Sequence, residues 1–361
     1  MMNCSTAPNN QRRLTNVNII RPVLIVLVVF YHAFAIFGGG WSSIDGFPEV
    51  KVYWWLDKLS YASLLESFVF ISGYVFGYQV RTKGEMLLEG KNLFWSKFKR
   101  LIIPSMFFSL FFIVLLEDDS LPLIKTLYCV INDVGHMWFL PMLFWCFVGI
   151  WIIEKLKLKP YFVLPLLILS SICSFVPLPL QMGVTMYYLL FFYIGYIIQR
   201  KDVGLTRFYT RRNVIILAIL FLIAFPLLTQ FRTNAEDLIA NKCRCLSENQ
   251  LIQKAVLLSA KKSARLVYSF IGLSLLFVIV GLAEKDQKLL IPHWVISIGG
   301  LSMGVYIFQQ FILKGIYFHS ALPHLLGPYL LPWFGFVLTL IMSLLFSYVM
   351  RLTKIGRLLI G

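Results

Sequence analysis

Charged residues are scarce in this chain, and acidic residues are the scarcest. Only 14% of the 361 residues are charged, with 17 Asp and Glu against 33 Lys and Arg. A soluble domain needs more charge on its surface, whereas 59% of this chain is hydrophobic and its mean hydropathy is +0.77. The composition therefore excludes a soluble enzyme and predicts an integral membrane protein.

The shortage of acid leaves a formal net charge of +16. In a soluble protein this excess would suggest a nucleic-acid partner. In a membrane protein it follows from the accumulation of Lys and Arg on the cytoplasmic side. Basic and aromatic residues do not interleave in any solvated domain, so we expect no nucleic-acid partner.

Cysteine spacings typical of a disulfide framework or a zinc site are also missing. Cys146 and Cys173 fall in apolar runs, where they are expected to be inert. Cys243 and Cys245 form C-x-C, which is too close for an ordinary disulfide and lacks the second pair of a zinc site. We expect no disulfide framework, no metal site and no permanently bound cofactor. No small-residue cleavage site follows the first apolar run, which we interpret as a retained helix.

Long apolar runs are what the chain has instead. Their lengths are close to the span of a bilayer, although several lie near the lower limit. The sequence therefore predicts an all-α integral membrane protein, a bundle of about ten transmembrane helices forming a single domain over residues 1–361. The runs are 19–37, 59–80, 101–116, 138–154, 161–176, 184–199, 213–230, 266–282, 293–313 and 328–350.

The distribution of basic residues predicts the orientation. Alternating the runs across a bilayer places 22 of the 33 Lys and Arg on the side of both termini. Of the other 11, seven fall in 231–265, which we interpret as one long extracytoplasmic loop. Long translocated loops weigh little in this rule, so both termini are expected in the cytoplasm. The expected location is the plasma or inner membrane of the cell, with many passes.

Two ionisable residues stand in the first apolar run, Arg21 and His32. Eleven helical residues turn through about 1100°, three turns plus about 20°, so the two share a face about 16 Å apart. An ionisable residue inside a membrane helix is a functional candidate. The ordinary alternatives are a neutral histidine bonded to a neighbouring helix and an arginine anchored at the interface.

Glu66, in the second run, lies at nearly the depth of His32. Groups at matching depth on adjacent antiparallel helices can share a hydrogen bond. A carboxylate in that position would fix the imidazole tautomer and raise its basicity, which predicts a His32–Glu66 dyad. The alternative is that Glu66 faces an aqueous outer vestibule.

The first apolar run contains an arginine followed, after ten residues, by a histidine. This pattern resembles the membrane-bound acyltransferase family 3, whose members O-acylate surface polysaccharides. Further blocks are similar to those of the family in the right order along almost the whole chain. They are "FVFISGYVFGY" (68–78), "KFKRLIIP" (97–104), "GHMWFLPMLFW" (135–145), "FFYIGYIIQR" (191–200) and "LSMGVYIFQQF" (301–311). Carried over by position, the resemblance implies functional roles for Arg21, His32, Lys97, Arg100, His136, Trp138, Ser302 and Tyr306.

The chain departs from the family pattern at two of these blocks. Lys97 stands where the family usually has an arginine, which weakens a bidentate grip on phosphate. Gln309 stands where many members have histidine, so this position supplies no acid or base. No soluble hydrolase-like domain is appended.

The resemblance implies an O-acyltransferase that takes an acyl group, most simply acetyl from cytoplasmic acetyl-CoA. Arg21, Lys97 and Arg100 fall at helix mouths expected on one side, which suits the phosphates of CoA. Their ordinary interpretation is topological charge. The acceptor would be a sugar hydroxyl of a surface polysaccharide or lipid-linked glycan. His32 would act either as general base or as a covalent acyl carrier.

The acceptor pocket is expected from two other segments. Ser302, Tyr306 and Gln309 form one polar stripe on an apolar helix, which in lipid faces protein or a cavity. His136 and Trp138 complete the expected pocket, although a belt tryptophan is common at a membrane interface. The rival function is a transporter or flippase for a lipid-linked glycan, which predicts broken helices in repeated halves. No internal repeat is evident.

Overall fold

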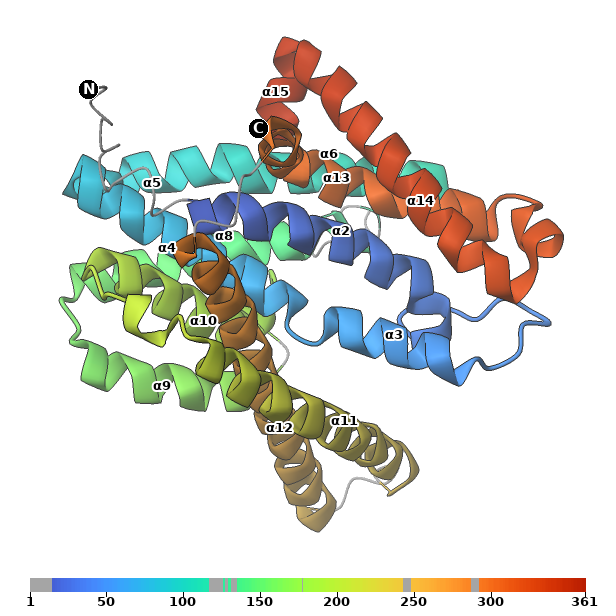
Figure 1. Ribbon diagram of the computed structural model, residues 1–361, viewed down its shortest axis with the longest axis horizontal. Helices are drawn as coiled ribbons and strands as arrows, with labels where there is room; N and C mark the ends of the chain where they lie inside the picture. Colours follow the sequence, from blue (N-terminus) through green and yellow to red (C-terminus); the bar gives the residue numbers. More distant parts are fainter. Residues whose placement is uncertain are drawn as a thin grey trace.

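The computed structural model describes residues 15–116, 126, 129–130, 135–176, 178–242, 248–286 and 292–361. Within these ranges the protein is a bundle of helices and contains no strand (Figure 1). The helical elements are α2 (Thr15–Gly38), α3 (Lys51–Tyr61), α4 (Leu64–Lys83), η1 (Glu85–Leu88), α5 (Gly90–Lys97), η2 (Phe98–Ile102), α6 (Ile103–Leu116), α8 (Phe139–Lys155), α9 (Pro160–Ile172), α10 (Met182–Arg200), η3 (Thr206–Phe208), α11 (Arg211–Lys242), α12 (Glu248–Lys285), α13 (His293–Phe318), α14 (Leu322–Leu352) and α15 (Lys354–Ile360).

Every apolar run of the sequence coincides with a helical segment. Eight segments among the described residues are long and apolar enough to cross a membrane. The shorter α8 and α9 have 17 and 13 residues. The prediction of a multi-pass all-α membrane bundle is confirmed. Cys243 and Cys245 lie outside the described residues.

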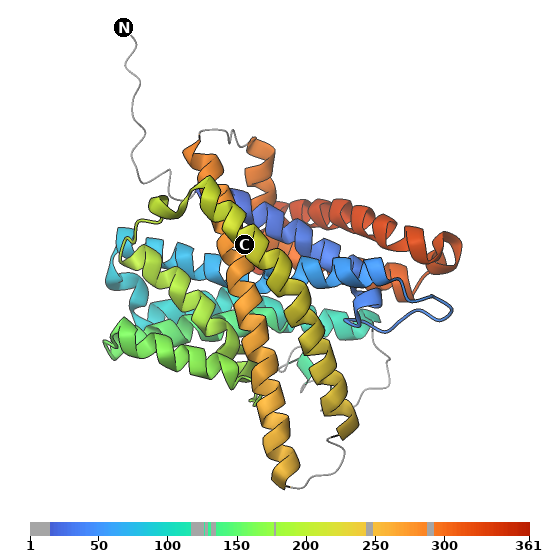
Figure 2. The ribbon, with the colours of Figure 1, turned by 60° about the horizontal axis from the view of Figure 1, so that its bottom comes forward.

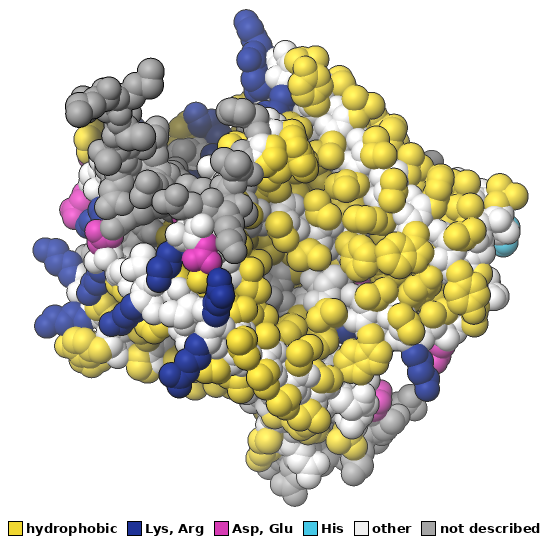
Figure 3. Space-filling model, in the orientation of Figure 1, with side chains coloured by type: hydrophobic (Ala, Val, Ile, Leu, Met, Phe, Trp, Pro, Cys, Tyr) yellow, Lys and Arg dark blue, Asp and Glu magenta, His cyan; other side chains and the backbone are white. Residues whose placement is uncertain are grey.

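The outer surface agrees with a lipid environment. Figure 3 shows apolar side chains over most of one face of the molecule, with Lys and Arg gathered towards one end of the bundle. Long apolar side chains of α14 and α11 stand exposed, including Leu330, Val337 and Leu222. An apolar surface of this size is stable where lipid tails cover it.

The prediction of a loop over 231–265 is wrong. α11 continues to Lys242 and α12 begins at Glu248, so helix occupies the segment on both sides of 243–247. The two helices form a long hairpin that projects obliquely from the bundle (Figures 1 and 2). Both helices extend beyond the apolar runs 213–230 and 266–282, and polar contacts join them close to the ends of these runs. Arg232 donates to the Tyr268 hydroxyl, and Lys261 pairs with Glu236.

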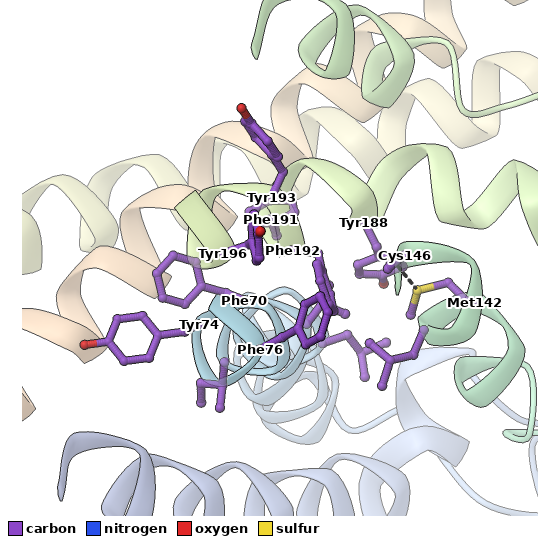
Figure 4. Close-up of a cluster of buried hydrophobic side chains, with 14 of the residues drawn as sticks. Phe70, Tyr74, Phe76, Met142, Cys146, Tyr188, Phe191, Phe192, Tyr193 and Tyr196 are labelled. Atoms are coloured by element: carbon purple, nitrogen blue, oxygen red, sulfur yellow. Dashed lines mark hydrogen bonds between the residues drawn. The ribbon is translucent and has the colours of Figure 1, made fainter. Parts of the chain in front are cut away.

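α4 lies in the middle of the bundle and packs tightly against α10. A Cβ atom at Gly73 or Gly77 would overlap the backbone carbonyl of Phe192 or Tyr196 on α10. Small residues four positions apart let two membrane helices approach in this way. Aromatic rings of both helices fill the space around the contact (Figure 4). This packing fixes the position of α4, which lines the site described below.

Gly77→Val should destabilise the fold severely. The added side chain meets backbone that cannot move aside, so we expect a loss of about 1–3 kcal/mol or more in the free energy of unfolding. The control is Gly315→Ala in α13, where no atom lies within 4 Å of an added Cβ. Thermal unfolding in detergent should show a lower midpoint for the first variant and an unchanged or higher one for the second. Equal midpoints would contradict the packing.

Candidate functional site

A cavity of about 460 Å³ opens between α2, α4, the junction of α5 with η2, α8, α13, α14 and the end of α15. Apolar side chains form most of its wall, among them Val75 and Leu143. Its polar lining residues are Arg21, Ser72, Gln79, Lys97, Arg100, Ser302, Tyr306 and Arg351. Three cations expected from the sequence therefore lie in one cavity, although they come from segments far apart in the chain.

The local structure of η2 places two of these cations. Residues Phe98–Ile102 form a turn of π-helix between α5 and α6. Such turns insert an extra residue and are frequent at functional sites. Lys97, the last residue of α5, and Arg100, within the turn, both line the cavity, as does Arg21 of α2.

The basic cluster, defined as Arg21, Lys97 and Arg100, gathers three positive charges at the cavity. Arg100 lies close enough to repel both other cations. None of the three forms a salt bridge with a carboxylate of the described residues. The Lys97 ammonium lies 4.0 Å from the ring centroid of Phe147 and 5.4 Å from that of Phe76. Like charges held together around a cavity favour an anionic ligand, and phosphate is the anion that Arg and Lys bind best.

Arg351 adds a fourth cation that the sequence did not indicate. It lies in the last turn of α14, and its Nη1 donates to the carbonyl of Gly300 at 3.3 Å. A basic residue directly after an apolar run is usually an interface anchor, so the position of Arg351 in the sequence did not indicate a binding role. Only the packing of α14 on α13 shows that it lines the cavity.

His32 lies one helical turn beyond the cavity, since Val28 is part of the cavity wall. The His32 Nδ1 lies 2.9 Å from the Val28 carbonyl. A carbonyl only accepts, so Nδ1 carries the proton and Nε2 keeps its lone pair. The imidazole ring lies beside Tyr31, at 4.8 Å between centroids, and Trp41, at 5.8 Å. His32 is therefore held in a tautomer suited to accept a proton at Nε2.

His136 and Tyr306 meet at this end of the cavity. The Tyr306 hydroxyl donates to the His136 carbonyl, and the two rings are 5.0 Å apart. His136 is buried, and its Nε2 donates to the Ile307 carbonyl at 3.0 Å. It lies close enough to His32 for an electrostatic interaction. The structure therefore places His136 against Tyr306, which lines the cavity.

The remaining expected acceptor residues divide between the cavity and the core. Ser302 lines the cavity, and its Oγ donates to the Gly299 carbonyl at 2.6 Å. Gln309 is fully buried outside the cavity, and its amide has no hydrogen-bond partner among the described residues. Trp138 does not line the cavity either, because its ring packs 6.0 Å from that of Tyr188. The predicted polar stripe therefore lines the cavity only through Ser302 and Tyr306.

The structure does not pair Glu66 with His32. Glu66 is fully buried, and its Oε1 accepts from Nε of Arg265 on α12 at 2.9 Å. Arg265 Nη2 also donates to the Tyr188 hydroxyl at 2.9 Å. The aqueous vestibule offered as the alternative is also wrong, since Glu66 has no exposed surface. Counting residues along a helix gives no direction around its axis, and the Glu66 side chain here meets Arg265 of α12.

Candidate metal ligands are a separate question. Among the described ranges no group of three or more His, Cys, Asp or Glu side chains is arranged to hold a metal ion. Cys146 is buried and Cys173 half-buried, and both are free thiols. The polar residues that line the cavity are instead cations, hydroxyl groups and one glutamine.

Together these features define a class: a multi-pass α-helical membrane protein with a cation-lined cavity leading towards an intramembrane histidine. Comparison with known protein families identifies the class of reaction. The acyltransferase domain of family 3 matches residues 14–352, nearly the entire chain, so the protein belongs to acyltransferase family 3 and is a membrane acyltransferase. No curated protein and no solved structure matches the chain. Nothing in these findings supports a glycan flippase.

Proposed function

We propose that the protein is an O-acyltransferase that moves an acetyl group from cytoplasmic acetyl-CoA to a sugar hydroxyl of a surface polysaccharide or lipid-linked glycan. One observation carries the proposal: the cavity extends from the basic cluster, which has no salt bridge among the described residues, to Val28, one helical turn before His32. The gathering of Lys and Arg at one end of the bundle supports a cytoplasmic location for that mouth. The membrane proposed is the plasma or inner membrane of the cell.

The cavity suits the parts of CoA in sequence. Arg21, Lys97, Arg100 and Arg351 would bind the phosphates, and the apolar middle would hold the uncharged arm. The thioester would then lie towards Tyr306 and Val28. A donor seated in this way leaves its carbonyl carbon within reach of the His32 side of the cavity.

His32 would act through Nε2. This nitrogen takes the proton of the acceptor hydroxyl while the hydroxyl oxygen attacks the thioester carbonyl. The carbon–sulfur bond then breaks, and the imidazolium returns the proton to the leaving thiolate of CoA. In the alternative, the same lone pair first attacks the thioester carbonyl and expels the CoA thiolate, which forms an acyl-imidazole; the acceptor hydroxyl then attacks this acyl group and frees the imidazole. Mass measurement of the protein directly after mixing with acetyl-CoA at neutral pH, without an acid step that would hydrolyse an acyl-imidazole, would distinguish a covalent acetyl group on His32 from direct transfer.

Arg21→Ala and Arg100→Ala should each raise the KM for acetyl-CoA more than they lower kcat. Each variant loses phosphate contacts made before the chemical step. One charge-assisted hydrogen bond is worth about 1.5–3 kcal/mol, which corresponds to a rise of roughly 10–150-fold. The matched control is Arg207→Ala, an exposed cation of η3 outside the cavity, which should leave the donor KM unchanged. An unchanged donor KM in both cavity variants would contradict the donor site.

A further inference from the structure

A second space approaches His32 from the opposite end of α2. It is a recess of about 320 Å³ formed by the last turn of α2 and the following segment. The donor cavity reaches Val28, four residues before His32, whereas the recess begins at Ile36, four residues after it. The two spaces share no lining residue. His32 therefore stands between them along its own helix.

Trp41 connects the recess to His32, because it lines the recess and its ring centroid lies 5.8 Å from that of the imidazole. Beyond Gly38 the chain turns back at Gly39, which has φ +76°, a conformation that favours glycine. The backbone N–H groups of Gly40 and Trp41 then both donate to the Ala35 carbonyl, at 3.0 and 3.2 Å. This turn lays the Trp41 indole beside the imidazole, with the ring planes inclined by only 30°.

Neighbouring helices hold this turn in place. The Lys58 ammonium of α3 donates to the Gly38 carbonyl at 2.5 Å and lies 3.4 Å from the Asp57 carboxylate. The Trp41 ring also packs against Tyr317 and Phe318 of α13, at 6.0 and 6.2 Å between centroids. Trp41 is therefore a fixed, half-exposed aromatic surface next to the proposed catalytic base.

The other lining groups favour an uncharged ligand rich in hydroxyls. Ser43 and Glu49 supply polar side chains to the recess, and Glu49 forms no salt bridge with another described residue. Residues 39–50 contain Asp45 and Glu49 but no Lys or Arg. A free carboxylate accepts hydrogen bonds from hydroxyls and repels anions. An aromatic face accommodates the C–H side of a sugar ring, so the combination resembles an apolar pocket with a few orienting polar groups.

We propose that this recess binds the acceptor as a neutral pyranose, with its ring stacked on Trp41 and its hydroxyls bonded to Glu49 and Ser43. The inference rests on the proposed O-acetyl transfer and names the acceptor class and its site. A sugar on Trp41 presents its remaining hydroxyl towards His32, while the thioester arrives from the donor cavity. A uronic acid or sugar phosphate would meet the carboxylate of Glu49 and bind poorly.

The test measures acceptor kinetics with the purified full-length protein, acetyl-CoA and two probe sets. One set consists of neutral methyl hexopyranosides and the other of the matching methyl uronides. We expect transfer to the neutral set, a rise of roughly 10-fold in acceptor KM for Trp41→Ala, and an unchanged donor KM. Trp41→Phe should retain most of the wild-type affinity. Glu49→Gln should reduce the discrimination against the uronides.

The matched control is Trp294→Ala, an exposed tryptophan of α13 that lines neither space. It should leave both KM values unchanged. Unchanged acceptor KM in Trp41→Ala and Glu49→Gln, or a wild-type preference for the uronides, would overturn the acceptor site while leaving acetyl transfer intact. Absence of any acetyl-CoA turnover by the wild type with either set would instead contradict the proposed function itself.

Discussion

His32→Ala is expected to lose at least about 100-fold in acyl transfer, because a general base or acyl carrier supplies that much or more. The variant should remain folded. Among the described residues the imidazole bonds to the Val28 carbonyl of its own helix, so alanine leaves no described partner on another helix without its bond. The measurement is the rate of CoA release with acceptor present, alongside the elution profile and thermal midpoint in detergent.

The control for this experiment is His324→Ala. His324 is exposed near the start of α14, so its loss should leave rate and midpoint unchanged. A His32→Ala protein that is folded and keeps more than roughly a tenth of the wild-type rate would exclude both catalytic roles.

Arg265→Ala should be among the most destabilising single substitutions in the protein. It leaves the Glu66 carboxylate fully buried without its cation, and breaking a buried pair in this way costs about 3–5 kcal/mol. The Tyr188 hydroxyl loses its donor at the same time. The double variant Arg265→Met with Glu66→Gln removes both charges and should recover part of the loss.

The control pair is Lys261 with Glu236, which joins α12 to α11 with the Glu236 side chain half exposed. Lys261→Ala should cost no more than about 1 kcal/mol, as surface pairs do. Thermal unfolding in detergent distinguishes the two pairs. A midpoint for Arg265→Ala equal to that of Lys261→Ala, or no recovery in the double variant, would contradict a structural role for the buried pair. A His32–Glu66 dyad would instead make Glu66→Gln shift the pH–rate profile without lowering the midpoint.

Hydropathy was sufficient to place the membrane helices. An apolar run of bilayer length has few alternatives to a helix, because every backbone polar group must be satisfied within the segment. Position along a helix was therefore predictable for Arg21, and the family motifs added Lys97 and Arg100. The structure places all three around one cavity.

Direction around a helix axis was not predictable in the same way. Glu66 bonds to Arg265 rather than to His32. Arg265 was hidden because its charge-rich segment was interpreted as a loop, although α12 runs through it. Arg351 and Trp41 gave no sequence signal either, since a basic residue or a tryptophan near a helix end is usually an interface anchor. Their proximity to the cavity and to His32 depends on tertiary packing.

The most direct test of the account follows the acyl group itself. Purified protein in lipid nanodiscs would be incubated with acetyl-CoA labelled in the acetyl group and an envelope extract from cells that lack this protein. The account predicts that label enters an alkali-labile ester with release of free CoA, and that acetyl-CoA raises the thermal midpoint of the protein. Absence of labelled ester, of CoA release and of any stabilisation by acetyl-CoA would contradict it.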